Sequence, residues 1–276
     1  QLALTQAERD MLDFAKTNCD GVVIVITSTN AMQLAELQDD EDVNAIIQVA
    51  TPGALGFKSV GRILNGTVNP SGRTVDTFSA DLTKNPTYVN FNNGTGNTAY
   101  KNARYTRDIW LAAFKGGADF NAPFLEYEEG VYVGYRWYET ASDLGYFTSA
   151  NLPADEDDPY YNRDNGVVYP FGYGLSYTTF EQSIEDVSDN DGEITVTVKV
   201  SNTGDVAGKD VVQLYYNPPY TAFDVDNDIE KPTANLVSFG KTDVIEPGDS
   251  VDVELTFNAE DMASYCYTHD NGNGTT

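Results

Sequence analysis

Histidine and cysteine are nearly absent from this chain of 276 residues, which has one histidine and two cysteines. The single imidazole, His269, excludes a metal site built on several histidines and leaves little room for a serine–histidine–aspartate triad. Cys19 and Cys266 are too few for a disulfide scaffold and form no Cys-x-x-Cys pair. Phosphate-binding glycine loops are missing as well. The sequence therefore predicts no metal and no cofactor.

Basic residues are scarce too, because 16 lysines and arginines stand against 43 acidic residues and the net charge is −27. This balance excludes nucleic-acid binding, which depends on basic side chains that displace counterions from phosphates. Neutral sugars are compatible with such a surface. The acidic runs at 39–42, 155–158 and 224–228 lack the glycine and the spacing of a calcium loop, so we interpret them as solvated.

Long apolar runs are also missing. No stretch reaches the roughly 18 apolar residues of a membrane span, and no basic segment followed by an apolar one marks a signal peptide. The compartment stays open between bacterial cytoplasm and secretion, and the oligomeric state stays open as well. An apolar content of 41% with 12% aromatic residues indicates a packed globular protein.

The N-terminal part of the chain begins with a helix signal. Thr5 followed by Glu8 three residues later is a capping box, and it predicts a helix over residues 5–17. Met11 and Leu12 are expected on the apolar stripe of this helix.

Two apolar, β-branched runs at 21–27 and 43–50 are typical of strands buried on both faces of a parallel sheet. A helix over about 51–64 follows and is expected to end at Asn65-Gly66. The alternation of helix and strand predicts an α/β layered domain with a mainly parallel sheet. Because two strands cannot form a doubly covered sheet, we expect part of this domain to lie before Gln1.

The middle of the chain is less regular. Residues 81–119 are rich in Asn, Gly and Thr, and they predict a long loop excursion. Alternating aromatics over 131–138 favour a strand rather than a helix.

After Phe180 the pattern changes to period two, which predicts a β-sandwich of four strands. The four runs are 193–200, 210–216, 236–241 and 250–257. We therefore expect two domains, at 1–180 and 181–276.

Three strings occur in the order found in one enzyme family. They are L-N-G-T-V-N-P-S-G-R-T-V-D-T-F at 64–78, E-E-G-V-Y-V-G-Y-R-W-Y at 128–138 and Y-P-F-G-Y-G-L-S-Y-T-T-F at 169–180. With V-x-N-T-G-x-x-A-G-x-x-V-V-Q-L-Y at 200–215, they resemble the C-terminal portion of glycoside hydrolase family 3 enzymes of the β-glucosidase kind. The resemblance implies part of the family's α/β sandwich domain followed by a truncated fibronectin type III-like domain.

The resemblance also implies a function, that of a retaining, exo-acting β-glycosidase acting on a β-linked oligosaccharide or aryl glycoside. Such enzymes use two carboxyl groups, and in this family the nucleophile lies on a (β/α)8 barrel. The acid/base glutamate would lie just before Gln1, because Gln1-Leu-Ala-Leu4 resembles the end of its loop. The chain would then carry no catalytic residue and would close the sugar cleft over a barrel supplied in cis or in trans.

Two residues are candidates for substrate binding. Glu128 belongs to a carboxylate cluster with Glu126 and Glu129, which could line a sugar site or form a solvated face paired with Arg136. Trp137 could stack on a sugar ring or belong to an aromatic core. The alternative to an enzyme is a non-catalytic carbohydrate-binding or scaffolding module built from the same domains.

The strings further predict a domain junction. Pro70 and Gly72 indicate a tight turn, after which Arg73 can clamp carbonyl or acidic groups at a domain seam. Gly172 and Gly174 would let the chain pass from one domain to the next, with aromatic side chains filling the junction.

Overall fold

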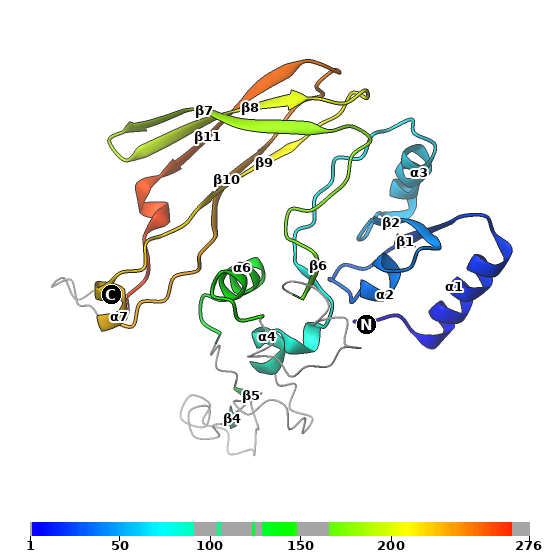
Figure 1. Ribbon diagram of the computed structural model, residues 1–276, viewed down its shortest axis with the longest axis horizontal. Coiled ribbons are helices and arrows are strands. Elements are labelled where there is room, and N and C mark those ends of the chain that lie inside the picture. The colour runs from blue at the N-terminus through cyan, green and yellow to red at the C-terminus, as the bar shows by residue number, and fades with distance from the viewer. Residues whose placement is uncertain (1, 91–103, 106–122, 125–128, 148–165, 267–276) are drawn as a thin grey trace, which may run out of the picture.

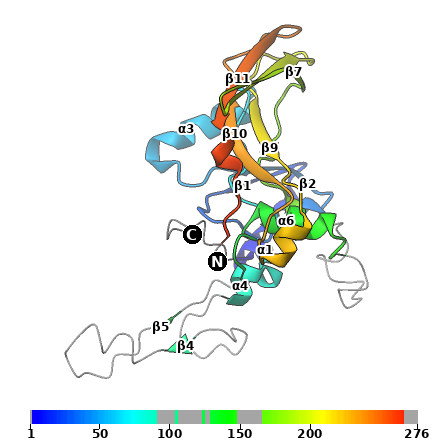
Figure 2. The ribbon, with the colours of Figure 1, turned by 90° about the vertical axis from the view of Figure 1, so that its left-hand side faces the viewer.

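The computed structural model describes residues 2–90, 104–105, 123–124, 129–147 and 166–266. It has a β-sandwich and a mixed α/β part, which Figure 1 shows as an upper and a lower layer. Two segments connect the two parts, one after residue 65 and one before residue 180, and they run side by side (Figure 1). A hydrogen bond joins them, in which Thr74 N donates to Tyr173 O at 2.7 Å. Figure 2 shows the same separation after a 90° turn. The predicted fold class is confirmed.

The first helix, α1 (Gln6–Asn18), begins where the capping box predicted. Glu8 N donates to Thr5 Oγ1 at 3.4 Å, and Thr5 N donates to Glu8 Oε2 at 2.7 Å. Leu12 packs against the core, but Met11 is exposed. The predicted stripe was therefore wrong at Met11, because the helix turns that side away from the sheet.

Strands β1 (Val22–Ile26) and β2 (Val43–Gln48) pair in parallel, as predicted, with the short helix α2 (Ala35–Gln38) between them in sequence. One face of β1 is buried against Leu34 and Leu37. On the other face Val23 and Val25 are 45% and 36% exposed. The expectation of a strand buried on both faces was wrong, because the described residues do not fully cover that second face.

Helix α3 (Gly53–Leu64) ends at Asn65, and Gly66 has a φ of 75°, as the Asn-Gly signal predicted. The chain then crosses to β3 (Phe78–Ser79), which pairs antiparallel with β6 (Val167–Tyr169).

The start of the predicted loop excursion is more regular than expected. It holds η1 (Leu82–Lys84) and α4 (Pro86–Asn90), and Asp81 accepts from Thr83 N at the start of η1. Farther along, β4 (Arg104–Tyr105) pairs with β5 (Pro123–Phe124). The remaining residues of the excursion lie outside the described residues.

The segment expected to be a strand at 131–138 forms a helix instead, α6 (Tyr135–Asp143). Gly134 begins it with a φ of 59°, a conformation that suits glycine. Tyr138 and Ala141 are both buried, and this spacing of three is helical. The alternation of aromatics was therefore misleading.

The sandwich consists of two sheets that enclose a valine-rich core. Its strands are β7 (Phe180–Asn190), β8 (Glu193–Asn202), β9 (Val211–Tyr216), β10 (Asn235–Lys241) and β11 (Ser250–Asn258). One sheet has the order β11-β8-β7 and the other pairs β10 with β9. Val196, Val198 and Val200 of β8 face Val212 of β9 in the core. The four predicted strands are confirmed, and β7 was missed because it is an edge strand of mostly exposed polar residues.

Helix α7 (Ala222–Asp226) lies between β9 and β10, and η2 (Ala259–Met262) follows β11. The interpretation of 224–228 as solvated was wrong at Asp224, which is buried and pairs with Lys231 at 2.6 Å. Cys19 and Cys266 form no disulfide. Within the described ranges, no helix is long and apolar enough to cross a membrane.

Candidate functional site at the domain seam

Two of the three family-like strings meet where the α/β part joins the sandwich. The turn at 69–73 contacts the segment 172–177 on one side and the sandwich on the other. We call this network the hub, and its members are Asn69, Ser71, Gly72, Arg73, Gly174, Asp210 and Lys241.

Arg73 makes the main ionic contact of the hub. Its Nη2 lies 2.7 Å from Oδ1 of Asp210, and both side chains are largely buried. Gln182 Nε2 donates to the other carboxylate oxygen at 2.7 Å, and Asp210 N donates to Thr242 Oγ1 at 2.9 Å. The buried carboxylate is satisfied by Arg73 and Gln182, and it needs such partners because an unpaired charge is costly to bury. The predicted clamp by Arg73 is confirmed.

Asn69 joins three parts of the chain through one side-chain amide. Its Nδ2 donates to Ala207 O of the sandwich at 3.1 Å. Its Oδ1 accepts from Ser176 Oγ at 2.9 Å and from Tyr177 N at 2.8 Å. These long-range hydrogen bonds fix the path of the segment 172–177, which leads into the sandwich.

Lys241 closes the hub from β10, where its Nζ donates to Ser71 O at 2.8 Å. Burial lowers the pKa of Lys241, and the nearby charges of Arg73 and Lys209 lower it further. Of the two hub cations Arg73 is the more buried, because Lys241 lies at the exposed edge of the hub.

Gly174 is required by space, and Gly172 is favoured by its left-handed backbone conformation. A β-carbon on Gly174 would lie 2.2 Å from Gly72 O, and one on Gly172 would lie 2.2 Å from Gln213 Oε1. Gly172 also has a φ of 80°. The predicted role of both glycines in the junction is confirmed.

Helix α6 forms a second contact between the two parts. The Tyr135 ring stacks on Phe171 with centroids 4.9 Å apart and meets Tyr215 edge-on at 5.8 Å. Leu236 N donates to Tyr135 Oη at 2.9 Å. Burial raises the pKa of Tyr215 to about 12, with contributions from Tyr135 and Glu139. The predicted aromatic filling of the junction is therefore present, and α6 supplies part of it.

Of the two predicted substrate-binding residues, the structure describes only Trp137, which is not a member of the hub. Glu128 and Glu126 lie outside the described residues. Trp137 lies on α6, where its ring meets Tyr146 edge-on at 5.3 Å and its Nε1 is buried. Glu129 is buried. This packing of Trp137 fits the core interpretation, and a sugar-binding role for Glu128 or Trp137 stays a prediction.

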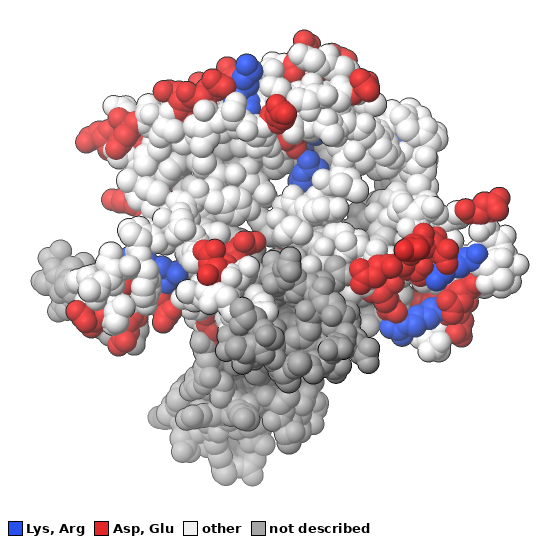
Figure 3. Space-filling model, in the orientation of Figure 1, with Lys and Arg blue, Asp and Glu red and all other residues white. Residues whose placement is uncertain are grey.

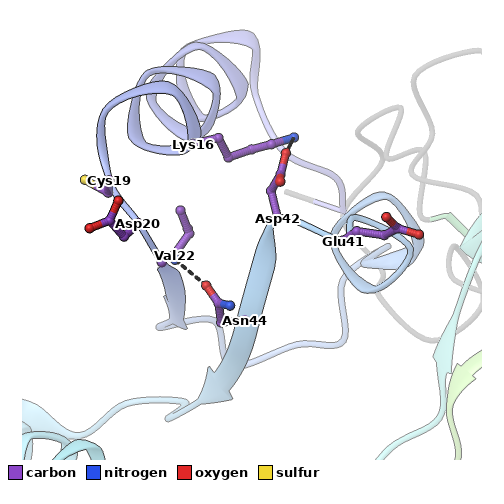
Figure 4. A pocket seen from close by; sticks show the side chains of 8 residues that line it. Lys16, Cys19, Asp20, Val22, Glu41, Asp42 and Asn44 are labelled. Carbon is purple, nitrogen blue, oxygen red and sulfur yellow. Dashed lines mark hydrogen bonds and ion pairs between the residues drawn. The ribbon is translucent and has the colours of Figure 1, made fainter.

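A small polar hollow lies between the end of α1 and the start of β2 (Figure 4). It has a volume of about 140 Å³, and Lys16, Asp20, Asp42 and Asn44 are among its lining residues. Lys16 Nζ lies 2.6 Å from Asp40 Oδ2 and 3.7 Å from Asp42 Oδ2. These ion pairs engage Lys16 and Asp42 of the lining. In the described part of the chain no group of three or more His, Cys, Asp or Glu side chains could hold a metal.

Sequence reasoning missed Asn69, Asp210 and Tyr135. Asn69 belongs to the string 64–78, so its polarity beside Pro70 was an available signal. Asp210 was interpreted only as the start of a strand. Its partner Arg73 is 137 positions away, and no local pattern connects the two.

The fold and the hub define a class of protein in which a short parallel α/β layer is fixed to a β-sandwich, five strands of which are described here. Residues 1–135 match the family model of the glycosyl hydrolase family 3 C-terminal domain, and residues 210–271 match that of the fibronectin type III-like domain. β-Glucosidase A of Butyrivibrio fibrisolvens is 30% identical over 95% of this chain and 27% of its own length. Thermostable β-glucosidase B of Acetivibrio thermocellus is 30% identical over 88% of this chain and 25% of its own length.

Solved structures agree with these matches. A β-glucosidase from Paenibacillus barengoltzii superposes with a TM-score of 0.69 at 29% identity, covering 95% of this chain and 23% of that one. β-Glucosidase 3B from Thermotoga neapolitana gives 0.66 at 29% identity, covering 95% and 30%. The chain therefore belongs to glycoside hydrolase family 3 and corresponds to the C-terminal portion of its members. It spans about a quarter of the length of the curated relatives named above.

Proposed function

We propose that this chain is the C-terminal portion of a retaining, exo-acting β-glucosidase that removes terminal β-linked sugars from an oligosaccharide or aryl glycoside. The observation that carries the proposal is the hub, where the family-like strings 64–78 and 169–180 meet in one hydrogen-bonded network. The β-glucosidase relatives support the choice of reaction, and the Thermotoga neapolitana relative was solved in complex with glucose.

The chemistry of such a reaction needs an acid/base and a nucleophile, two carboxyl groups about 5 Å apart. In our proposal both come from outside this chain, and the nucleophile comes from a (β/α)8 barrel. The chain then acts by position, because it closes the sugar cleft and holds the acid/base segment in register. A displacement of about 1 Å at a reacting group can lower a rate roughly a hundredfold.

The uncovered face of β1 supports a larger assembly. Parallel sheets are ordinarily covered on both faces, yet Val23 and Val25 are exposed here. We propose that a further layer of the same enzyme covers this face. We also propose the predicted division into domains 1–180 and 181–276, which falls within one residue of the start of β7 at Phe180.

Hydrolysis of an aryl β-glucoside tests the proposal. The purified chain alone should give no turnover, and turnover should appear when it is mixed with the separately expressed portion of Butyrivibrio fibrisolvens β-glucosidase A that it does not match. Turnover by the chain alone would contradict our placement of the carboxyl groups and make Glu126 to Glu129 the first targets. Sugar affinity without turnover in the mixture would favour a non-catalytic carbohydrate-binding module.

A further inference from the structure

Three stretches of chain at the seam carry no charge, and the hub residues Arg73, Asp210 and Lys241 beside them are the charged exceptions. Residues 63–72, 169–180 and 235–240 contain no Asp, Glu, Lys or Arg, although the whole chain has a net charge of −27. Figure 3 shows largely uncharged surface over β9 and β10, below the acidic rim of the sandwich. An uncharged surface on so acidic a protein is what a protein–protein contact requires, because charged residues are depleted at the centres of such contacts.

Large apolar side chains are exposed in the same place. We call them the seam ring, and its members are Val75, Leu175, Tyr177 and Phe239. Each member lies within two residues of a hydrogen bond at the seam. Val75 follows Thr74, which bonds Tyr173. Leu175 and Tyr177 flank Ser176, which bonds Asn69, as does Tyr177 N. Phe239 lies two residues before Lys241, which bonds Ser71. Single exposed apolar residues are ordinary, but a group of them beside one junction indicates a contact surface.

Phe239 shows how this surface continues an interface that already exists. It pairs with Gln213 on β9 and shares that residue's face of the sheet. On this face Gln213 lies against Gly172, and Tyr215 meets Tyr135 of α6. Gly240 faces the opposite way, toward Leu255 in the core. The α/β part thus covers the β9 side of the sheet face, while Phe239 on β10 remains 70% exposed.

We propose that the seam ring is the docking surface for the barrel-bearing portion of a family 3 β-glucosidase. This inference rests on the proposed function and adds to it the surface through which the two portions join. Two observations favour this occupant over another protein. The ring is continuous with the interface between the chain's own two parts, and relatives that align with nearly the whole chain extend far beyond it, since the match covers only 27% of β-glucosidase A.

Binding of the intact chain to the separately expressed, unmatched portion of Butyrivibrio fibrisolvens β-glucosidase A tests the inference by calorimetry. Phe239→Thr should weaken binding at least about tenfold, because a buried aromatic is a common anchor of such contacts. The melting temperature of the Phe239→Thr variant should stay within a degree or two of that of the wild type, because the Phe239 side chain is exposed. Leu175→Ser should act in the same direction as Phe239→Thr.

Ile184→Thr is the matched control, because Ile184 is 63% exposed on β7 and belongs to neither the hub nor the ring. It should bind like the wild type. Equal binding by Phe239→Thr and the wild type, or an equal loss in Ile184→Thr, would overturn the inference and leave the proposed function standing. No binding by the wild-type chain would overturn both. Self-association that Phe239→Thr abolishes would assign the ring to a second copy and overturn the inference.

Discussion

Gly174 and Gly72 pass so close to each other at the seam that no side chain fits between them. A β-carbon on Gly174 would lie 2.2 Å from the carbonyl oxygen of Gly72, which is backbone and cannot rotate away. We expect Gly174→Val to lower the free energy of unfolding by about 2 kcal/mol or more, because overpacking forces the backbone to shift. Thermal unfolding of the purified chain measures it.

Gly61 provides the control for this change. It lies inside α3, and a β-carbon there would meet nothing within 4 Å. Gly61→Ala should therefore stabilise the chain by roughly 0.5–1 kcal/mol through helix propensity. An unchanged melting temperature for Gly174→Val would contradict the steric role of Gly174.

The ion pair of Arg73 with Asp210 allows a second prediction at the residue scale. Arg73→Gln removes the cation from a buried carboxylate, and such changes cost about 3–5 kcal/mol when burial is complete. We expect about 2–4 kcal/mol here, because Arg73 retains some exposure. Chemical denaturation measures the loss.

Lys209→Gln is the matched control for Arg73→Gln. Lys209 lies 3.4 Å from Asp243, and that carboxylate is fully exposed. Exposed pairs contribute roughly 0–1 kcal/mol, so the change should have little effect. Equal losses in the two variants would show that burial of the Asp210 pair has no special role.

At the scale of elements, α7 is held by Asp224, which accepts from Thr221 N at 2.7 Å and pairs with Lys231. The bond from Lys231 lowers the pKa of Asp224 to about 2 from an ordinary value of 3.8. A lowered pKa contributes stability that is present above about pH 4 and is lost as the pH falls toward 2. Asp224→Asn should therefore melt lower than the wild type at pH 6, with the difference shrinking between pH 4 and pH 2.

Asp226→Asn serves as the comparison, since Asp226 is exposed on the same helix. Its melting temperature should follow that of the wild type across the whole range. A difference between Asp224→Asn and the wild type that stays constant from pH 6 to pH 2 would contradict the assigned role of the ionised carboxylate.

Elements with local signals were predictable from the sequence, and elements decided by distant contacts were not. The capping box at Thr5 and the Asn65-Gly66 stop involve neighbouring residues only. Helix α6 was mistaken for a strand because its pattern allowed both. Tyr132, Tyr135 and Tyr138 recur every three residues, and that spacing was the available helix signal. Contacts of Tyr135 with Phe171 and Tyr215, far along the chain, fix the outcome.

The candidate site likewise has residues that local signals predict and residues that only distant contacts place. The glycines and Arg73 were recognisable because turns and clamps have short signatures. Asp210 and the exposed position of Phe239 depend on how β9 and β10 pack, which no stretch of sequence specifies alone.

At the scale of the whole molecule, the chain combines an acidic exterior with the exposed apolar side chains of the seam ring and an exposed apolar face of β1. These two surfaces explain why we assign it a positional role. Surface repulsion from a net charge of −27 is screened at physiological salt, whereas apolar contacts are not. Joining the two portions of the enzyme should therefore survive added salt.

The central claim is that this chain completes a sugar cleft whose carboxyl groups lie elsewhere. The most direct measurement is the rate of aryl β-glucoside hydrolysis as the chain is titrated into a fixed amount of the barrel-bearing portion of β-glucosidase A. We predict a rate near zero for either component alone and a rise that saturates at one chain per barrel. A rate proportional to the chain concentration without the barrel portion, or no rise on mixing, would contradict the account.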